Sequence, residues 1–176
     1  MGYTPAYNAT FGKPLLNQLI AIIQRDQAAA ISIVNPVLAP IACFCVGPAT
    51  RTAFPWLTLA ADSTVFDPEA LGTRKSVTRI SLALDVGQFD LEMALLNAQD
   101  YGRMLDMVVT SASISDFETP LPIHDPPGEG WTSPPAAGSV KNVFVESHLY
   151  GSARLKEVEA PIVCVTLNVK FELEET

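Results

Sequence analysis

Residues Pro161 to Glu175 alternate between apolar and polar side chains almost without interruption. A period of two places successive residues on opposite faces of a β-strand. One face carries Val163, Val165, Leu167, Val169, Phe171 and Leu173, and the other carries Cys164, Thr166, Asn168, Lys170, Glu172 and Glu174. We therefore expect a half-buried strand whose second face meets water or a partner, as is typical of antiparallel sheets.

Two helices are predicted earlier in the chain. Pro14 suits a first helical turn, and apolar residues follow at helical spacing as far as Gln27. A second helix is expected over Leu91–Val108, with Asp90 as its N-cap. Its predicted apolar face is made of Leu91, Ala94, Leu95, Ala98, Tyr101, Leu105 and Val108.

Alternation predicts further strands. One runs over Thr52–Ala61 and another over Val77–Val86, joined by a polar connection over Asp62–Ser76. Short strands are also expected over Thr110–Phe117, Val140–Tyr150 and Ala153–Glu159, with a turn at Gly151 and Ser152. In the second of these, Val143 and Val145 are expected on one face, and Phe144, Glu146, His148 and Tyr150 on the other. The expected fold class is α+β, a mostly antiparallel sheet packed by two helices.

A length of 176 residues is typical of one domain. Residues 1–12 are expected to form an extended arm whose aromatic side chains, Tyr3, Tyr7 and Phe11, contact a neighbouring subunit. Residues 13–176 then form a single α+β domain. Within it, residues 118–139 contain six prolines and three glycines, which predicts a long loop with a functional or mobile role.

The composition points to an oligomer. Hydrophobic residues make up 48% of the chain and charged residues 17%, against about 25% charged residues in an average protein. Part of the apolar excess is therefore expected to be covered by other subunits. The net charge of −8 argues against a protein that binds nucleic acid through clustered Lys and Arg, although an acidic surface can repel DNA.

The uncharged segment Ala28–Thr50 is long enough to cross a membrane, but a span is not expected because Asn35, Pro36, Pro40 and Pro48 interrupt it. We expect a buried or subunit-covered run of short strands and turns instead. The first residues do not have the pattern of a secretory signal. Three cysteines with no framework spacing predict reduced thiols in a cytosolic setting.

An enzyme is not expected. The phosphate-binding, dinucleotide-binding, hydrolase and zinc-protease motifs are absent from the sequence, and the two histidines have no orienting partners nearby. Asp85 and Asp90 fall on a strand exterior and a helix cap, which does not suit a catalytic pair. His124 and Asp125 have no further ligand at metal spacing, so neither a metal nor another cofactor is predicted. His124 and Trp131, both in the long loop, are instead candidate partner contacts, as is Lys170.

The order of these elements resembles the tail terminator and head–tail joining proteins of tailed bacteriophages. The resemblance runs from Pro14 to Glu175 and rests on FPWLTLA, RISLALDV, LEMALLNAQDYGRMLDMVV and APIVCVTLNVKFELEE, taken in that order. In that family an aromatic or aliphatic residue and a proline precede the first strand, as Phe54 and Pro55 do here. The uncharged segment 28–50 and the large loop 118–139 depart from the family pattern.

The resemblance implies a structural virion protein, made in the host cytoplasm, that forms a ring, typically of six copies. The ring would cap the tail tube and join it to the neck, with tail-tube and neck or connector proteins as its partners. DNA would pass through it without specific binding. Acidic residues lining such a lumen would repel DNA, and the candidates are Asp62, Asp67, Glu69 and Glu118.

Two alternatives remain open at this point. The chain is alternatively another tail or neck component, such as a tail-tube protein. The other alternative is a small oligomeric α+β binding protein or hydrolase that uses His124, Asp125 and Cys164.

Overall fold

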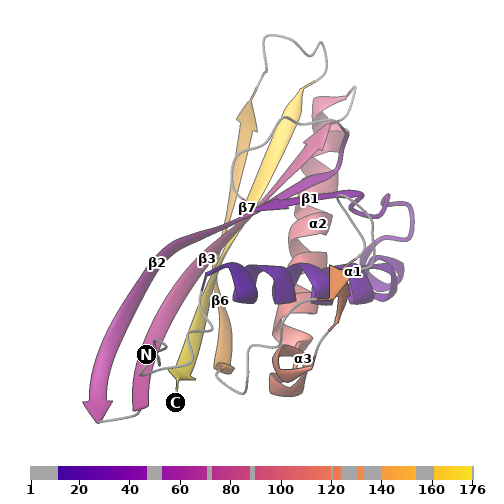
Figure 1. Ribbon diagram of the computed structural model, residues 1–176. Helices are drawn as coiled ribbons and strands as arrows, with labels where there is room; N and C mark the ends of the chain where they lie inside the picture. Colours follow the sequence, from indigo (N-terminus) through magenta and orange to yellow (C-terminus); the bar gives the residue numbers. More distant parts are fainter. Residues whose placement is uncertain are drawn as a thin grey trace.

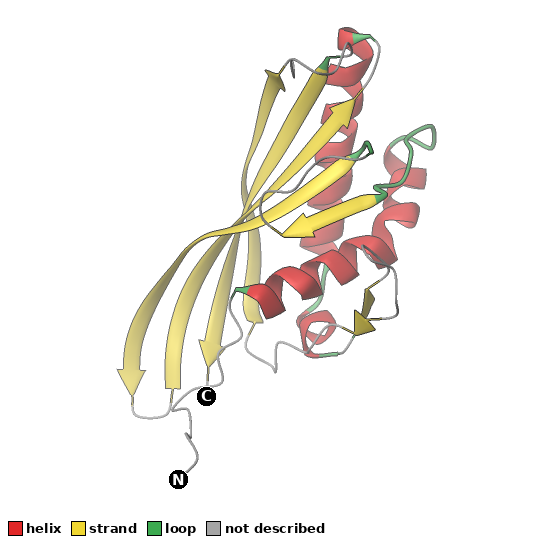
Figure 2. Ribbon diagram, turned by 45° about the horizontal axis from the view of Figure 1, so that its top comes forward, coloured by secondary structure: helices red, strands yellow, loops and turns green. Residues whose placement is uncertain are grey.

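Five strands form one sheet, and two long helices cover one of its faces (Figures 1 and 2). The computed structural model describes residues 12–46, 53–70, 73–87, 90–119, 121–123, 131–132, 140–153 and 161–175. The helices are α1 (Lys13–Val34), α2 (Leu91–Ser111) and the short α3 (Ile114–Glu118). The strands are β1 (Cys43–Val46), β2 (Trp56–Ala70), β3 (Thr73–Gly87), β4 (Pro122–Ile123), β5 (Trp131–Thr132), β6 (Val140–Ala153) and β7 (Ile162–Glu175).

The strand order in the sheet is β1-β2-β3-β7-β6. Only β1 and β2 are parallel, and the other neighbours are antiparallel. The central pair, β3 and β7, is in register from Arg74 opposite Glu175 to Gly87 opposite Ile162 without a bulge. β4 and β5 form a separate two-stranded ladder. The predicted α+β class with a mostly antiparallel sheet is therefore confirmed.

The core lies between the helices and the face of the sheet that we call the inner face. All six apolar residues predicted for the inner side of β7 are buried there, and Ile80, Leu82, Leu84 and Val86 of β3 lie beside them. α2 contributes Ala94, Ala98, Leu105 and Val109, and α1 contributes a dense run of leucine and isoleucine. Strict alternation in the two central strands thus predicted their buried faces correctly.

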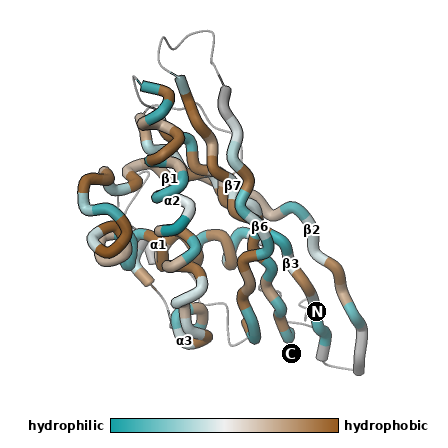
Figure 3. The backbone as a smooth tube through the Cα atoms, turned by 180° about the vertical axis from the view of Figure 1, so that it is seen from behind, coloured by the Kyte–Doolittle hydropathy of each residue, from teal (hydrophilic) through white to brown (hydrophobic). Residues whose placement is uncertain are grey.

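The stretch Asp62–Ser76, which we predicted to be a polar connection, is instead most of a long hairpin. β2 continues to Ala70 and β3 begins at Thr73, with Val65 opposite Val77. The sheet here extends well beyond the helices, and its residues are mostly hydrophilic, without the apolar enrichment of a core strand (Figures 2 and 3). We call this part of the sheet, toward the β2–β3 connection, the distal half.

Helical structure is also more extensive than predicted. α1 continues to Val34 through the uncharged segment, with β1 following at Cys43. None of the described helices is long and apolar enough to span a membrane. The strand predicted over Thr110–Phe117 is wrong: α2 ends at Ser111 and α3 follows, because Ser113 and Asp116 form a capping box that starts a new helix.

β6 differs from the prediction in length and in facing. Gly151 and Ser152 belong to the strand rather than to a turn. A bulge between Val145 and Ser147 inserts one residue, which reverses the alternation of all the residues after it. His148 therefore faces α2, where its Nε2 lies 3.0 Å from Oδ2 of Asp106, and does not share a face with Phe144.

Candidate assembly surfaces

The outer face of the sheet, away from α1 and α2, carries a polar chain that crosses four strands. Asp62 of β2 accepts a hydrogen bond from the Ser81 hydroxyl of β3. Ser81 also lies 3.3 Å from Oδ1 of Asn168 in β7, and Nδ2 of Asn168 donates to the Ser147 hydroxyl of β6 at 2.8 Å. Each group satisfies its neighbour, so this face does not need a partner to pair its polar groups.

Charged residues of opposite sign flank this chain in the distal half of the outer face. Arg79 lies 3.1 Å from Glu146, and Lys141 lies 3.7 Å from Glu174. Lys170 and Asn142 both donate to Glu172 at 2.8 Å, and these two hydrogen bonds, Lys170's first, lower the pKa of the Glu172 carboxyl. Because these pairs are open to solvent, each adds little to stability. Their effect is to leave a polar face of nearly balanced charge.

Lys170, a predicted partner contact, lies on this face but is engaged within its own chain. Besides Glu172, its ammonium lies 5.3 Å from the centre of the Phe144 ring. A subunit contact through Lys170 remains a prediction.

The four candidate lumen carboxylates do not share one face. Asp62 and Asp67 are exposed on the outer face of β2, in its distal half. Glu69 belongs to β2 by its backbone. Glu118 is exposed at the end of α3, whose Phe117 packs on Phe171 from the inner side of the sheet. Glu118 is therefore separated from Asp62 and Asp67 by the sheet.

Several other candidate residues lie outside the described residues, namely Tyr3, Tyr7, Phe11, His124 and Asp125. Trp131 is described by its backbone, which pairs with Ile123 in the β4–β5 ladder. The region predicted as one long loop thus contains the end of α3 and a short strand pair.

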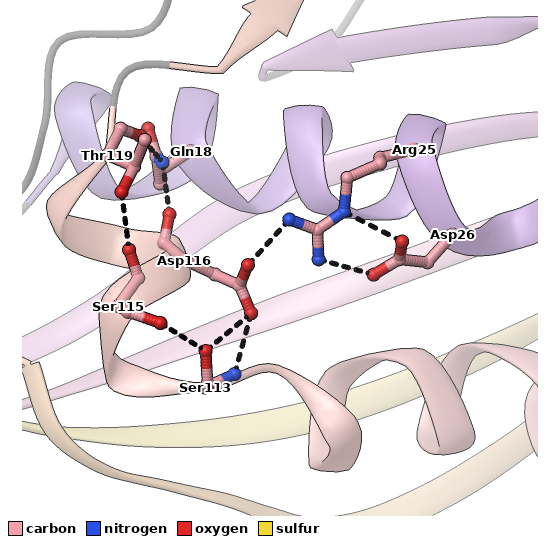
Figure 4. Close-up of polar contacts among 7 residues, drawn as sticks. All are labelled: Gln18, Arg25, Asp26, Ser113, Ser115, Asp116 and Thr119. Carbon is pink, nitrogen blue, oxygen red and sulfur yellow. Dashed lines mark hydrogen bonds and ion pairs between the residues drawn. The ribbon is translucent and has the colours of Figure 1, made fainter.

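This region is held on α1 by a polar cluster that sequence reasoning did not find (Figure 4). The buried Gln18 side chain donates from Nε2 to the carbonyl oxygens of Asp116, at 2.5 Å, and Thr119, at 2.7 Å. Arg25 donates to Asp116 at 2.5 Å and to its neighbour Asp26. These hydrogen bonds therefore fix α3, which follows α2 in the chain, on α1.

The charges of this cluster stabilise one another. The hydrogen bond from Arg25, and to a smaller extent those from Ser113, lowers the pKa of the Asp116 carboxyl. Hydrogen bonds to Asp26 and then Asp116 raise the pKa of the Arg25 guanidinium. The only sequence signal was the spacing of Ser113 and Asp116, which is that of a capping box.

The part of the chain that the structure describes has few features of the kind found in enzyme sites. The three cysteines are free thiols on the outer face. The Trp56 indole donates to Cys45 Sγ at 3.2 Å. Sγ of Cys164 lies 3.7 Å from the Thr166 hydroxyl. Among the described residues, no group of three or more His, Cys, Asp or Glu side chains could hold a metal ion. The hydrolase alternative would require His124 and Asp125, which lie outside these residues.

A corner with a cavity is formed where the chain leaving α1 meets α2. Asn35 donates to Asp100 at 2.8 Å, and the Tyr101 hydroxyl donates to the Ala39 carbonyl at 2.6 Å, so the α1–β1 connection is fixed against α2. Burial raises the pKa of Tyr101 to about 12. Beside these bonds is a cavity of about 190 Å³, lined by Val37, Leu38, Ala39, Phe54, Pro55, Val86, Gly87, Asn97 and Tyr101.

Comparison with known proteins gives matches among solved structures. No family model matches the chain, and no curated protein matches it. A chain of the solved structure titled "Virion of native gene transfer agent (GTA) particle" is similar in fold, with a TM-score of 0.55 and 10% sequence identity. The similarity covers 93% of this chain and 99% of that one.

Proposed function

We propose that this chain is a structural protein of a phage-like virion, which forms a ring that ends the tail tube and joins it to the neck. The observation that carries the proposal is the fold shared, along nearly the whole length of both chains, with a chain of a gene transfer agent virion. The element order favours the terminator and joining role within such a particle. In this role the protein acts by assembly and needs no catalytic residue.

The edges of the sheet support assembly into a ring. Within the described part of the chain, β6 pairs only with β7, and β2 pairs only with β3 beyond Leu59. Such unpaired edges invite pairing with another chain. β2 and β6 run antiparallel to one another, so a head-to-tail contact between copies would continue the alternation of the sheet. A heterologous contact of this kind closes into a ring when the rotation fits.

The outer face suits the lumen of such a ring. Its polar groups are paired with one another and its charges nearly balance, so its described residues present no cluster of Lys and Arg that would hold DNA. Asp62 and Asp67 are exposed carboxylates on this face. DNA would pass without specific contacts. The partners would be the tail tube on one side and a neck or connector protein on the other, with the protein in the virion.

The assembly of the purified protein tests this function. Light scattering after size-exclusion chromatography should give the mass of a closed oligomer, six copies in our proposal, and negative-stain images should show rings with an open channel. Long tubes would favour a tail-tube protein instead. A compact trimer with enclosed pockets would favour the binding-protein or hydrolase alternative.

A further inference from the structure

The cavity at the corner between α1 and α2 is open and has both polar and apolar groups on its walls. Val37 is 89% exposed, and Met93 and Leu96 of α2 are 46% and 50% exposed. Met93 lies one helical turn before Asn97, which lines the cavity, and Leu96 lies one turn before Asp100, which binds Asn35. Of these exposed apolar side chains Val37 lines the cavity, and Met93 and Leu96 lie on the helix that contributes Asn97 and Tyr101 to it. Exposed apolar side chains near a cavity are common at protein contacts.

The size of the cavity fits a side chain better than a small-molecule ligand. Its volume of about 190 Å³ is below the roughly 300–1,000 Å³ of small-molecule sites. Its walls combine apolar side chains with Asn97 and the Tyr101 hydroxyl, so an aromatic side chain with a polar tip would be matched at both ends. Tyrosines of this kind are frequent anchors at interfaces.

The chain carries such side chains in residues 1–11, which include Tyr3, Tyr7 and Phe11 and no charged side chain. This arm joins the domain at Gly12, at the start of α1, whereas the cavity lies beyond the other end of the same helix. A helix of 22 residues is about 33 Å long. The arm therefore begins far from the cavity of its own subunit.

The reach of the arm decides which subunit it can serve. At about 3.4 Å per residue, Tyr7 extends roughly 17 Å from Gly12, and Tyr3 roughly 31 Å even when every residue is fully extended. Tyr7 and Phe11 thus cannot reach the cavity of their own chain, and Tyr3 could do so only by lying straight along α1. A neighbouring copy is under no such restriction.

We propose that the arm of one subunit docks on the α1–α2 corner of the next, with Tyr7 seated in the cavity. The proposal rests on the proposed ring, and it names a contact within it. Each subunit would give its arm to one neighbour and receive the arm of the other, which is the head-to-tail contact that a ring requires.

Cross-linking tests the contact directly. In a background with Cys43, Cys45 and Cys164 replaced by serine, Tyr7→Cys is combined with Val37→Cys and the assembled protein is oxidised. We expect covalent dimers and higher multimers on a non-reducing gel, and each single-cysteine variant is the control. A ring that gives only intramolecular bonds, or none, overturns the proposal.

Arm variants give a second test. Tyr3→Ala combined with Tyr7→Ala should raise the protein concentration needed for assembly by at least about tenfold, since interface aromatics often contribute that much. The matched Tyr→Phe pair keeps the aromatic rings and loses only the hydroxyl groups, so it should assemble better than the alanine pair. On the receiving side, Val37→Asp should weaken assembly, and Ile114→Asp, at another exposed apolar position on α3, should not. If the alanine pair forms rings at the same protein concentration as the wild type, the arm contact alone is refuted. If the wild-type chain itself forms no ring, the proposed function is refuted as well.

Discussion

At the scale of single residues, Gln18 illustrates how one buried polar side chain fixes a segment of chain. It is buried in α1, and its amide donates to two carbonyl oxygens at the end of α3. Gln18→Ala would leave those carbonyls without a donor, at a cost of about 1–3 kcal/mol. Urea unfolding should show this loss, whereas Asn17→Ala on the same helix should change stability by less than about 0.5 kcal/mol.

Asp116 provides a pH-dependent prediction at the same scale. Its pKa in the folded protein is lowered, chiefly by the Arg25 hydrogen bond, relative to the unfolded chain. Folding is therefore stabilised by the ionised carboxylate above the usual aspartate pKa of about 4, and this stabilisation is lost as the pH falls through the folded-state pKa.

The variant Asp116→Asn should consequently unfold at lower urea concentration than the wild type at pH 7, and the difference should shrink as the pH is lowered below about 4. The measurement is the urea midpoint of both proteins across this range. A difference that stayed constant with pH would show that the charge of Asp116 is not the source of its effect.

At the scale of elements, β7 separates folding from surface properties. Leu167 is buried on its inner face, so Leu167→Asp would place an unpaired charge in the core and should abolish folding. Val165→Asp should do the same. Lys170→Glu on the outer face should leave a folded subunit, because Lys170 lies outside the core. Its contacts with Glu172 and Phe144 are both at the surface.

The measurements for this comparison are circular dichroism and the yield of soluble protein. If the outer face of β7 is also an interface between copies, Lys170→Glu should lower assembly while the spectrum of the subunit stays unchanged. Soluble, fully folded Leu167→Asp would contradict the assignment of the inner face.

The elements also show why the sequence predicts some regions and not others. β3 and β7 were predictable because each lies on the core through most of its length, so burial enforces alternation. The distal half of β2 leaves the helices behind, and its polar residues resemble a loop. In β6 a single bulge reverses the facing of His148, which no periodicity reveals in advance.

Among the candidate surfaces, some residues were predictable from the sequence and others required the fold. Asp62 and Asp67 could be proposed as lumen residues from their charge alone. In the structure both lie on the outer face of β2. Glu118 could not be separated from them without knowing that α3 packs on the inner side. The α1–α2 corner joins four segments distant in sequence, so only the fold brings Val37, Phe54 and Asn97 to one cavity.

At the scale of the whole molecule, the position of the acidic residues tests the orientation of the ring. If the outer face lines a channel, Asp67→Lys would place positive charge along the path of DNA and should slow genome ejection. Glu118→Lys makes the same change of charge on the other side of the sheet and should leave ejection unchanged. Particles with each variant can be compared by following DNA release, provided that both assemble normally. The difference should diminish with added salt, because charges beyond about 10 Å are screened at 0.1 M ionic strength. Equal ejection rates for both variants and the wild type would place the outer face away from the lumen.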